Sequence, residues 1–133
     1  MNSYLNHPCS PLYQLFLFEK IIESTGELQF VTSLSTVFLY VSREILQFIC
    51  DAILSTVTNY KYVWVIDCDE VTEYKDIRNI LHIANGVASK YKHHLTQVVF
   101  QHPTRFIHTM LHKYWHELSD DLQQIIVIAE LNN

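Results

Sequence analysis

The sequence predicts an α/β domain with a mostly parallel sheet of four to five strands and helices on its faces. Residues 62–66 form a continuous apolar, β-rich run that ends at Asp67, as expected for a central parallel strand covered on both faces. Apolar residues from Ile77 to Tyr91 then recur at the spacing of an amphipathic helix. Strand-like and helix-like segments alternate along the chain, which is typical of parallel sheets.

The C-terminal third continues this alternation. Residues 95–100 repeat the strand pattern, a helix is expected to begin at Pro103, and residues 125–128 form the last expected strand. This order predicts right-handed crossover connections. Because the chain has 133 residues and no visible linker or internal repeat, residues 11–131 are expected to form one domain.

Two interpretations fit the N-terminal segment. Residues 1–10 are mostly polar, so a flexible arm is expected there. Residues 11–23 fit a helix that begins at Pro11, or a strand that pairs across a turn at Gly26 with residues 27–31. Both alternatives stay open.

Two further strands and a helix are expected before the central strand. Residues 28–31 and 36–41 have β-like composition. Ser42 then precedes a helix whose apolar residues cover more than half of its circumference, so this helix is expected to be largely buried. The apolar residues are Ile45, Leu46, Phe48, Ile49, Cys50, Ile53, Leu54 and Val57.

The amino-acid composition limits the classes of partner, cofactor and cellular location that are expected. The formal net charge is −5 and the nine Lys and Arg residues are scattered, so nucleic acid is not an expected partner. Only two glycines are present, which argues against a glycine-rich phosphate loop, and no cofactor is expected. Three widely spaced cysteines without a CxxC pair fit a reducing compartment. Without a long apolar run or a signal peptide, the expected location is the cytoplasm, with no transmembrane segment.

Acidic residues follow the expected central strand. Asp67 and Asp69 lie at its carboxyl end, where open α/β sheets place their sites, and carboxylates there could hold Mg²⁺. The stretch Asp67-Cys68-Asp69-Glu70 resembles the first motif of haloacid-dehalogenase-type phosphatases, which implies Asp67 as nucleophile and Asp69 as acid/base. It is also similar to the metal-binding DxD of glycosyltransferases. Asp67 and Asp69 are therefore candidate catalytic and metal-binding residues, beside the commoner role of solvated loop carboxylates.

Three histidines form a second candidate metal site. His108, His112 and His116 are spaced i, i+4 and i+8, which would place them along one stripe of a helix. Neither an acidic residue nor a cysteine is fixed beside them by spacing, and there is no HExxH arrangement. A solvated helix face is the favoured interpretation.

Residues 62–128 resemble the second half of a CRAL-TRIO lipid-binding domain. The resemblance rests on a strand ending in Asp67, on Tyr91 near a helix end, on the strand at 95–100 and on the segment 101–106, which contains Pro103 and Phe106. Leu118 and the strand at 125–128 complete the order. The resemblance implies a small α/β domain that binds a lipid or another apolar ligand.

The same region is also similar in length and order to a STAS domain. Asp67 lies near the place where the central strand of that family ends. The phosphorylatable Asp-Ser of the family has no counterpart around residues 73–77, so switching by phosphorylation is not implied.

The N-terminal segment supplies the expected interface. Residues 12–18 carry more apolar surface than one face of a helix or strand can bury in a small domain, so a contact through Leu15, Phe16, Leu17 and Phe18 is expected. The favoured function is a non-catalytic binding or assembly module that acts through protein–protein contacts, with a protein partner or a homo-oligomer. Two alternatives remain: a binder of a lipid or other apolar ligand, and a Mg²⁺-dependent phosphatase or transferase that uses Asp67 and Asp69.

Overall fold

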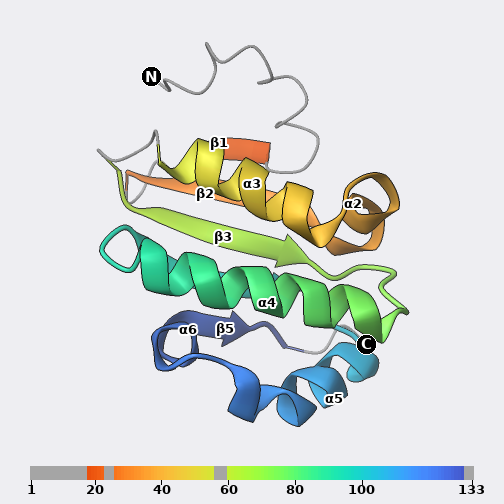
Figure 1. Ribbon diagram of the computed structural model, residues 1–133. Helices are drawn as coiled ribbons and strands as arrows, with labels where there is room; N and C mark the ends of the chain where they lie inside the picture. Colours follow the sequence, from red (N-terminus) through yellow and green to blue (C-terminus); the bar gives the residue numbers. More distant parts are fainter. Residues whose placement is uncertain (1–17, 23–25, 56–59, 131–133) are drawn as a thin grey trace.

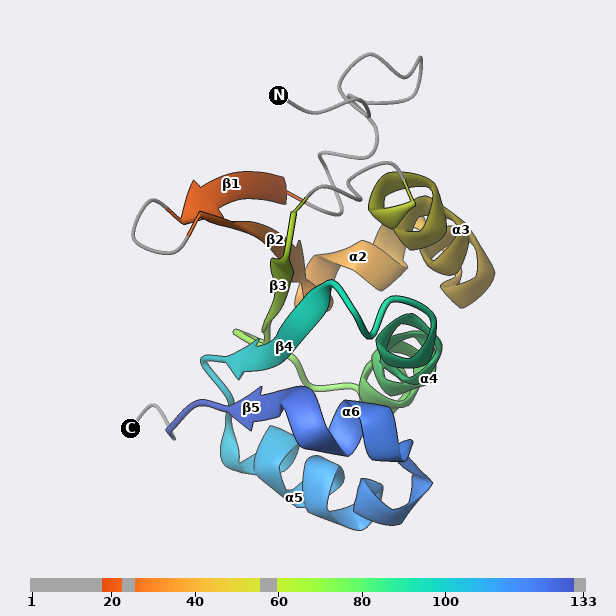
Figure 2. The same ribbon diagram turned by 90° about the vertical axis from the view of Figure 1, so that its left-hand side faces the viewer.

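A five-stranded sheet runs through the computed structural model, which describes residues 18–22, 26–55 and 60–130. Its strands are β1 (Phe18–Ile22), β2 (Glu27–Ser33), β3 (Tyr62–Asp67), β4 (Leu95–Gln101) and β5 (Ile126–Ile128). They lie side by side in chain order; β1, β2 and β3 follow one another in Figure 1, and all five strands are visible in Figure 2. Strands β2 to β5 are parallel, and β1 pairs antiparallel with β2. The predicted α/β class is confirmed.

The helices form a second layer beside the sheet. They are α2 (Leu34–Tyr40), α3 (Arg43–Leu54), α4 (Tyr74–Lys90), α5 (Arg105–Lys113) and α6 (Asp120–Ile125), with a 3₁₀ turn, η2 (Trp115–Glu117). The side-chain hydroxyls of Ser42, Thr104 and Ser119 cap α3, α5 and α6 by accepting a hydrogen bond from a backbone N–H in the first turn.

The main core lies between the sheet and this helical layer. In register across the sheet, Phe30 pairs with Trp64 and Trp64 with Val98, and all three are buried with the inner faces of α3 and α4. Among the described residues, no helix covers the other face of the sheet (Figure 2). Strands that follow in chain order through right-handed crossovers place every connecting helix on the same face. The expectation that β3 would be buried on both faces is nevertheless confirmed, because Val63 and Val65, which alternate with the core-facing residues, are also buried, at 7 % and 4 % exposed.

The sheet face away from the helices carries a row of four valines that pair in register across β2, β3, β4 and β5. Side chains alternate between the two faces of a strand, so these valines point away from the helices. We call them the valine row. It consists of Val31, Val65, Val99 and Val127.

The structure distinguishes between the helix and the strand predicted for residues 11–23 over part of that segment. Residues 18–22 form β1, whose pairing with residues 27–31 turns at Gly26, a residue with φ of +72°. The strand interpretation is therefore confirmed for residues 18–22, where the helix interpretation is wrong, and a turn with positive φ favours glycine. The flexible arm expected at 1–10 and the remainder of 11–17 lie outside the described residues.

One predicted strand is wrong. Residues 36–41 were expected to be extended, yet residues 34–40 form α2. Leu34 and Val37 are buried, and Phe38 and Val41 are partly buried against the same core. The spacing of these four residues fits a helix that packs one face on β2 and β3. Tertiary packing therefore overrides the β propensity of this segment.

Three smaller differences concern helices. The helix expected at Pro103 begins at Arg105, after Thr104 as N-cap. The short helix α6 precedes β5 where no helix was expected. Helix α3 is less buried than its sequence indicates, because Ile45 and Phe48 face solvent.

No helix in the described part of the chain is long and apolar enough to cross a bilayer.

Candidate functional site

The acidic pair lies at the carboxyl end of β3, as predicted. Asp67 is half-buried there, whereas Asp69 and Glu70 are exposed. The Oδ1 atom of Asp67 accepts a hydrogen bond of 3.1 Å from the backbone N–H of Asp69. Glu70 has a φ of 64°, so the chain turns sharply away from the strand at this point. The contact between Asp67 and Asp69 is therefore a turn in which the first carboxylate holds the loop backbone.

His102 is a neighbour of this turn that the sequence did not reveal. Its Nδ1 atom lies 3.1 Å from Oδ1 of Asp67. The residue follows β4 directly and has a φ of 54°, which is uncommon for a residue other than glycine. Parallel strands end at the same edge of a sheet, so β3 and β4 bring these two side chains together. The sequence could have indicated this contact, because Asp67 ends one strand and His102 directly follows Gln101 at the end of the next.

The histidine stripe is broken in the structure. His108 and His112 lie on α5, but this helix ends at Lys113, and His116 belongs to η2. His112 and His116 are exposed, whereas the Nε2 atom of His108 is buried and has no hydrogen-bond partner among the described residues. Within residues 18–22, 26–55 and 60–130, no three His, Cys, Asp or Glu side chains are grouped to hold a metal ion.

The two described cysteines are poor nucleophiles. Cys50 and Cys68 are free and buried. Burial raises the pKa of each thiol to about 12. Since the thiolate is the reactive form, neither side chain has the electropositive, accessible setting of a catalytic cysteine. Cys9 lies outside the described residues.

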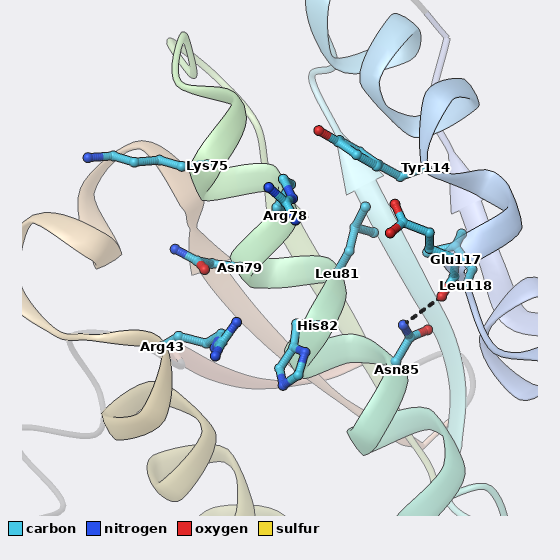
Figure 3. A pocket seen from close by; sticks show the side chains of 10 residues that line it. All are labelled: Arg43, Lys75, Arg78, Asn79, Leu81, His82, Asn85, Tyr114, Glu117 and Leu118. Carbon is cyan, nitrogen blue, oxygen red and sulfur yellow. Dashed lines mark hydrogen bonds between the residues drawn. The ribbon is translucent and has the colours of Figure 1, made fainter.

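The most clearly charged feature is a hollow of about 390 Å³ across the outer face of α4, which we call the cationic hollow (Figure 3). Helix α4 supplies most of its lining. Arg43 reaches toward α4 from the start of α3, and Tyr114 and Glu117 border the opposite side. The lining residues are Arg43, Lys75, Arg78, Asn79, Leu81, His82, Asn85, Tyr114, Glu117 and Leu118.

Two polar contacts shape this hollow. Asn85 joins α4 to the segment after α5, because its Nδ2 donates to the carbonyl of Glu117 at 3.1 Å and its Oδ1 accepts from the backbone N–H of Ser119 at 2.8 Å. The guanidinium carbon of Arg78 lies 5.7 Å from the centroid of the Tyr114 ring, within the range of a cation–π contact.

A second hollow of about 410 Å³ continues the first toward the corner between α2 and α3. The two share Arg43, Lys75 and Asn79. Its charges are mixed, because Glu44 and Asp76 also line it. Burial raises the pKa of Asp76, and the neighbouring Lys75 opposes that shift. Positive charge is therefore concentrated in the first hollow.

Apolar side chains are exposed at the junction of α2 and α3. Leu39 and Tyr40 are each 76 % exposed at the end of α2, and Ile45 and Phe48 are 52 % and 67 % exposed on α3. We call these four residues the apolar corner. Because the buried stripe of α3 faces the sheet, Ile45 and Phe48 form a second apolar stripe that points outward.

The predicted interface residues fall at the edge of what the structure describes. Phe18 is the first residue of β1 and pairs in register with Val31. Leu15, Phe16 and Leu17 lie outside the described residues. Neither a scan against protein-family models nor a search of curated proteins found a match for this chain.

Proposed function

We propose that this chain is a non-catalytic assembly module that pairs with a second copy of itself through the apolar corner. The observation that carries the proposal is the exposure of Leu39, Tyr40, Ile45 and Phe48 within one short stretch, at 52 % to 76 %. Single exposed apolar residues are common on soluble proteins. Four large ones gathered within ten residues favour an association surface.

Charges beside the apolar corner support a contact between identical copies. Arg43 and Glu44 stand next to each other at the start of α3, with Arg43 Nη2 and Glu44 Oε1 3.4 Å apart. In a two-fold contact each surface faces itself, so Arg43 of one copy would meet Glu44 of the other and the reverse. Glu44 is also one helical turn from Phe48, which places this charge pair at the rim of the apolar corner.

The test compares the mass of the wild type with that of Phe48→Asp across a range of concentrations, by light scattering. We expect the wild type to approach the dimer mass and Phe48→Asp to remain monomeric, because a charge replaces a large apolar side chain that is 67 % exposed. Val127→Ser is the matched control, since Val127 is an exposed apolar residue on β5. It should keep the dimer.

Three outcomes would contradict the proposal. The first is a wild type that stays monomeric at its highest soluble concentration. The second is a dimer that both variants weaken equally. The third is a complex with a different protein in place of the dimer. Circular dichroism of each variant shows whether the fold is retained, and Ile45→Lys provides a second substitution should Phe48→Asp fail to fold.

A second candidate function is the binding of a lipid or another apolar ligand on the sheet face away from the helices. The valine row favours it, because four β-branched side chains form an apolar strip across β2 to β5, from buried Val65 to exposed Val127, on a face that no described helix packs against. The resemblance of residues 62–128 to CRAL-TRIO domains points to the same ligand class. Native mass spectrometry tests this candidate, since a bound lipid would add its mass to the purified protein and Val127→Asp, at the exposed end of the row, should remove it.

A further inference from the structure

The cationic hollow stands out against the charge of the whole chain. The formal net charge is −5, with 14 Asp and Glu residues and nine Lys and Arg. Three of those nine cations, Arg43, Lys75 and Arg78, line this hollow together with His82, whereas Glu117 is its one acidic residue. An acidic protein that gathers cations in a recess has a local positive potential there, which attracts anions.

The charges of this hollow are largely available to a ligand. Within the described part of the chain, Lys75 and Arg78 form no ion pair, and the pair between Arg43 and Glu44 is exposed to solvent. Arg78 lies over the ring of Tyr114, and no carboxylate among the described residues forms an ion pair with its N–H groups. Exposed pairs contribute little, so a ligand would displace the Arg43 contact at small cost.

The spacing of the hydrogen-bonding side chains on α4 indicates a ligand with several negative groups. Lys75, Arg78 and His82 follow one another at i, i+3 and i+7 on α4. Seven residues of helix correspond to roughly 10 Å along the axis. A single phosphate is too short to contact side chains spread over that length, whereas linked or multiple phosphates are not.

The chemistry of the lining fits phosphate oxygens. The guanidinium of arginine forms paired hydrogen bonds to phosphate, and lysine supplies a compact charge. Asn79 adds an amide donor that makes no hydrogen bond to the other described residues. Asn85, by contrast, is already occupied by its contacts to Glu117 and Ser119.

We propose that the cationic hollow binds a soluble small molecule that carries more than one phosphate group. A volume of about 390 Å³ is in the range of small-molecule sites. The hollow is recessed between α3, α4 and η2, and the net charge of −5 opposes approach to an anionic membrane, so a free ligand is favoured over a lipid headgroup. The hollow contains no residue of the apolar corner, and Arg43 is the one lining residue that it shares with the charge pair beside that corner.

The probe is inorganic triphosphate, titrated by calorimetry at low ionic strength beside orthophosphate. We expect triphosphate to bind the wild type at least tenfold more tightly. Lys75→Gln with Arg78→Gln should weaken that binding by at least about tenfold, because each exposed charge contributes modestly and two are lost. Arg43 is left unchanged because it also borders the apolar corner.

The matched control removes two positive charges elsewhere. Lys61 and Lys92 are exposed and do not line the hollow, so Lys61→Gln with Lys92→Gln changes the net charge equally and should retain triphosphate binding. The proposal is overturned if triphosphate does not bind, if it binds no better than orthophosphate, or if both double variants weaken it equally. Binding only to vesicles that contain a phosphorylated inositol lipid would also overturn it. Circular dichroism verifies that each variant is folded.

Discussion

The indole Nε1 of Trp64 donates a hydrogen bond of 2.8 Å to the hydroxyl of Thr32. The two side chains come from neighbouring strands, β3 and β2, and face the helical layer. Thr32 is fully buried and is the one buried polar residue among the described positions. A buried donor without an acceptor is costly, so this contact helps to fix how the two strands pair.

Replacing the acceptor should therefore destabilise the protein. We expect Thr32→Val to lower the free energy of unfolding by about 1–3 kcal/mol, because the N–H of Trp64 loses its acceptor inside the core. Urea unfolding followed by circular dichroism measures the change. In a Trp64→Phe background the same substitution should cost much less, and an equal cost in both backgrounds would show that the hydrogen bond is not responsible.

Asn85 should contribute more stability than Asn79, although both lie on α4 and line the same hollow. Asn85→Ala removes two hydrogen bonds to the segment that joins α5 to α6, and we expect a loss of about 1–2 kcal/mol. Asn79→Ala removes none within the described residues and should change stability by no more than about 0.5 kcal/mol. Because both replace the same residue type in one helix, helix propensity cancels, and equal urea midpoints would contradict this account.

Tyr62→Phe should be tolerated and should stabilise the fold slightly. The hydroxyl of Tyr62 is buried and has no hydrogen-bond partner among the described residues, and burial raises the pKa of this phenol. Removing an unsatisfied buried hydroxyl should raise the free energy of unfolding by up to about 1 kcal/mol. A clear loss of thermal stability would indicate that the hydroxyl has a partner, such as a bound water.

Cys50 and Cys68 should react with thiol reagents only after unfolding. Burial raises the pKa of both thiols to about 12, from an ordinary value of 9.0. In a Cys9→Ser variant at pH 8, we expect almost no reaction with Ellman's reagent until denaturant is added. Rapid labelling of the folded variant would show that the thiols are accessible.

The same shift gives a pH dependence of stability. The folded state retains protons on Cys50 and Cys68 between their ordinary pKa of 9.0 and about 12, whereas the unfolded state releases them. The folded state then binds more protons, so its stability should fall as pH rises above 9. Melting temperatures from pH 8 to 10.5 measure this, and Cys50→Ala with Cys68→Ala should reduce the slope.

The acidic turn should contribute little to the fold. Asp67→Asn with Asp69→Asn should leave the melting temperature close to that of the wild type, because both residues lie at a strand exit outside the core. Added Mg²⁺ should not change the melting temperature of the wild type. A rise in the wild type and none in the double variant would favour the Mg²⁺-dependent enzyme over an assembly module.

The sequence by itself determined the elements with strong periodicity. The apolar run at 62–66 and the repeated spacing along 77–91 became β3 and α4, because a buried strand and an amphipathic helix each require one pattern. Asp67 lies at the strand end that the sequence indicated. The turn at Gly26 was also readable, since a positive φ favours glycine there.

Only the tertiary structure decided which surfaces stay exposed and which distant residues meet. Residues 36–40 have β-like composition, yet they are helical because Leu34 and Val37 pack on the sheet. The outward stripe of α3, the contact of His102 with Asp67 and the gathering of Arg43 with Lys75 and Arg78 all depend on how strands and helices lie side by side. Local patterns specify a helix or a strand, whereas the neighbours of each face follow from sheet order and crossover handedness.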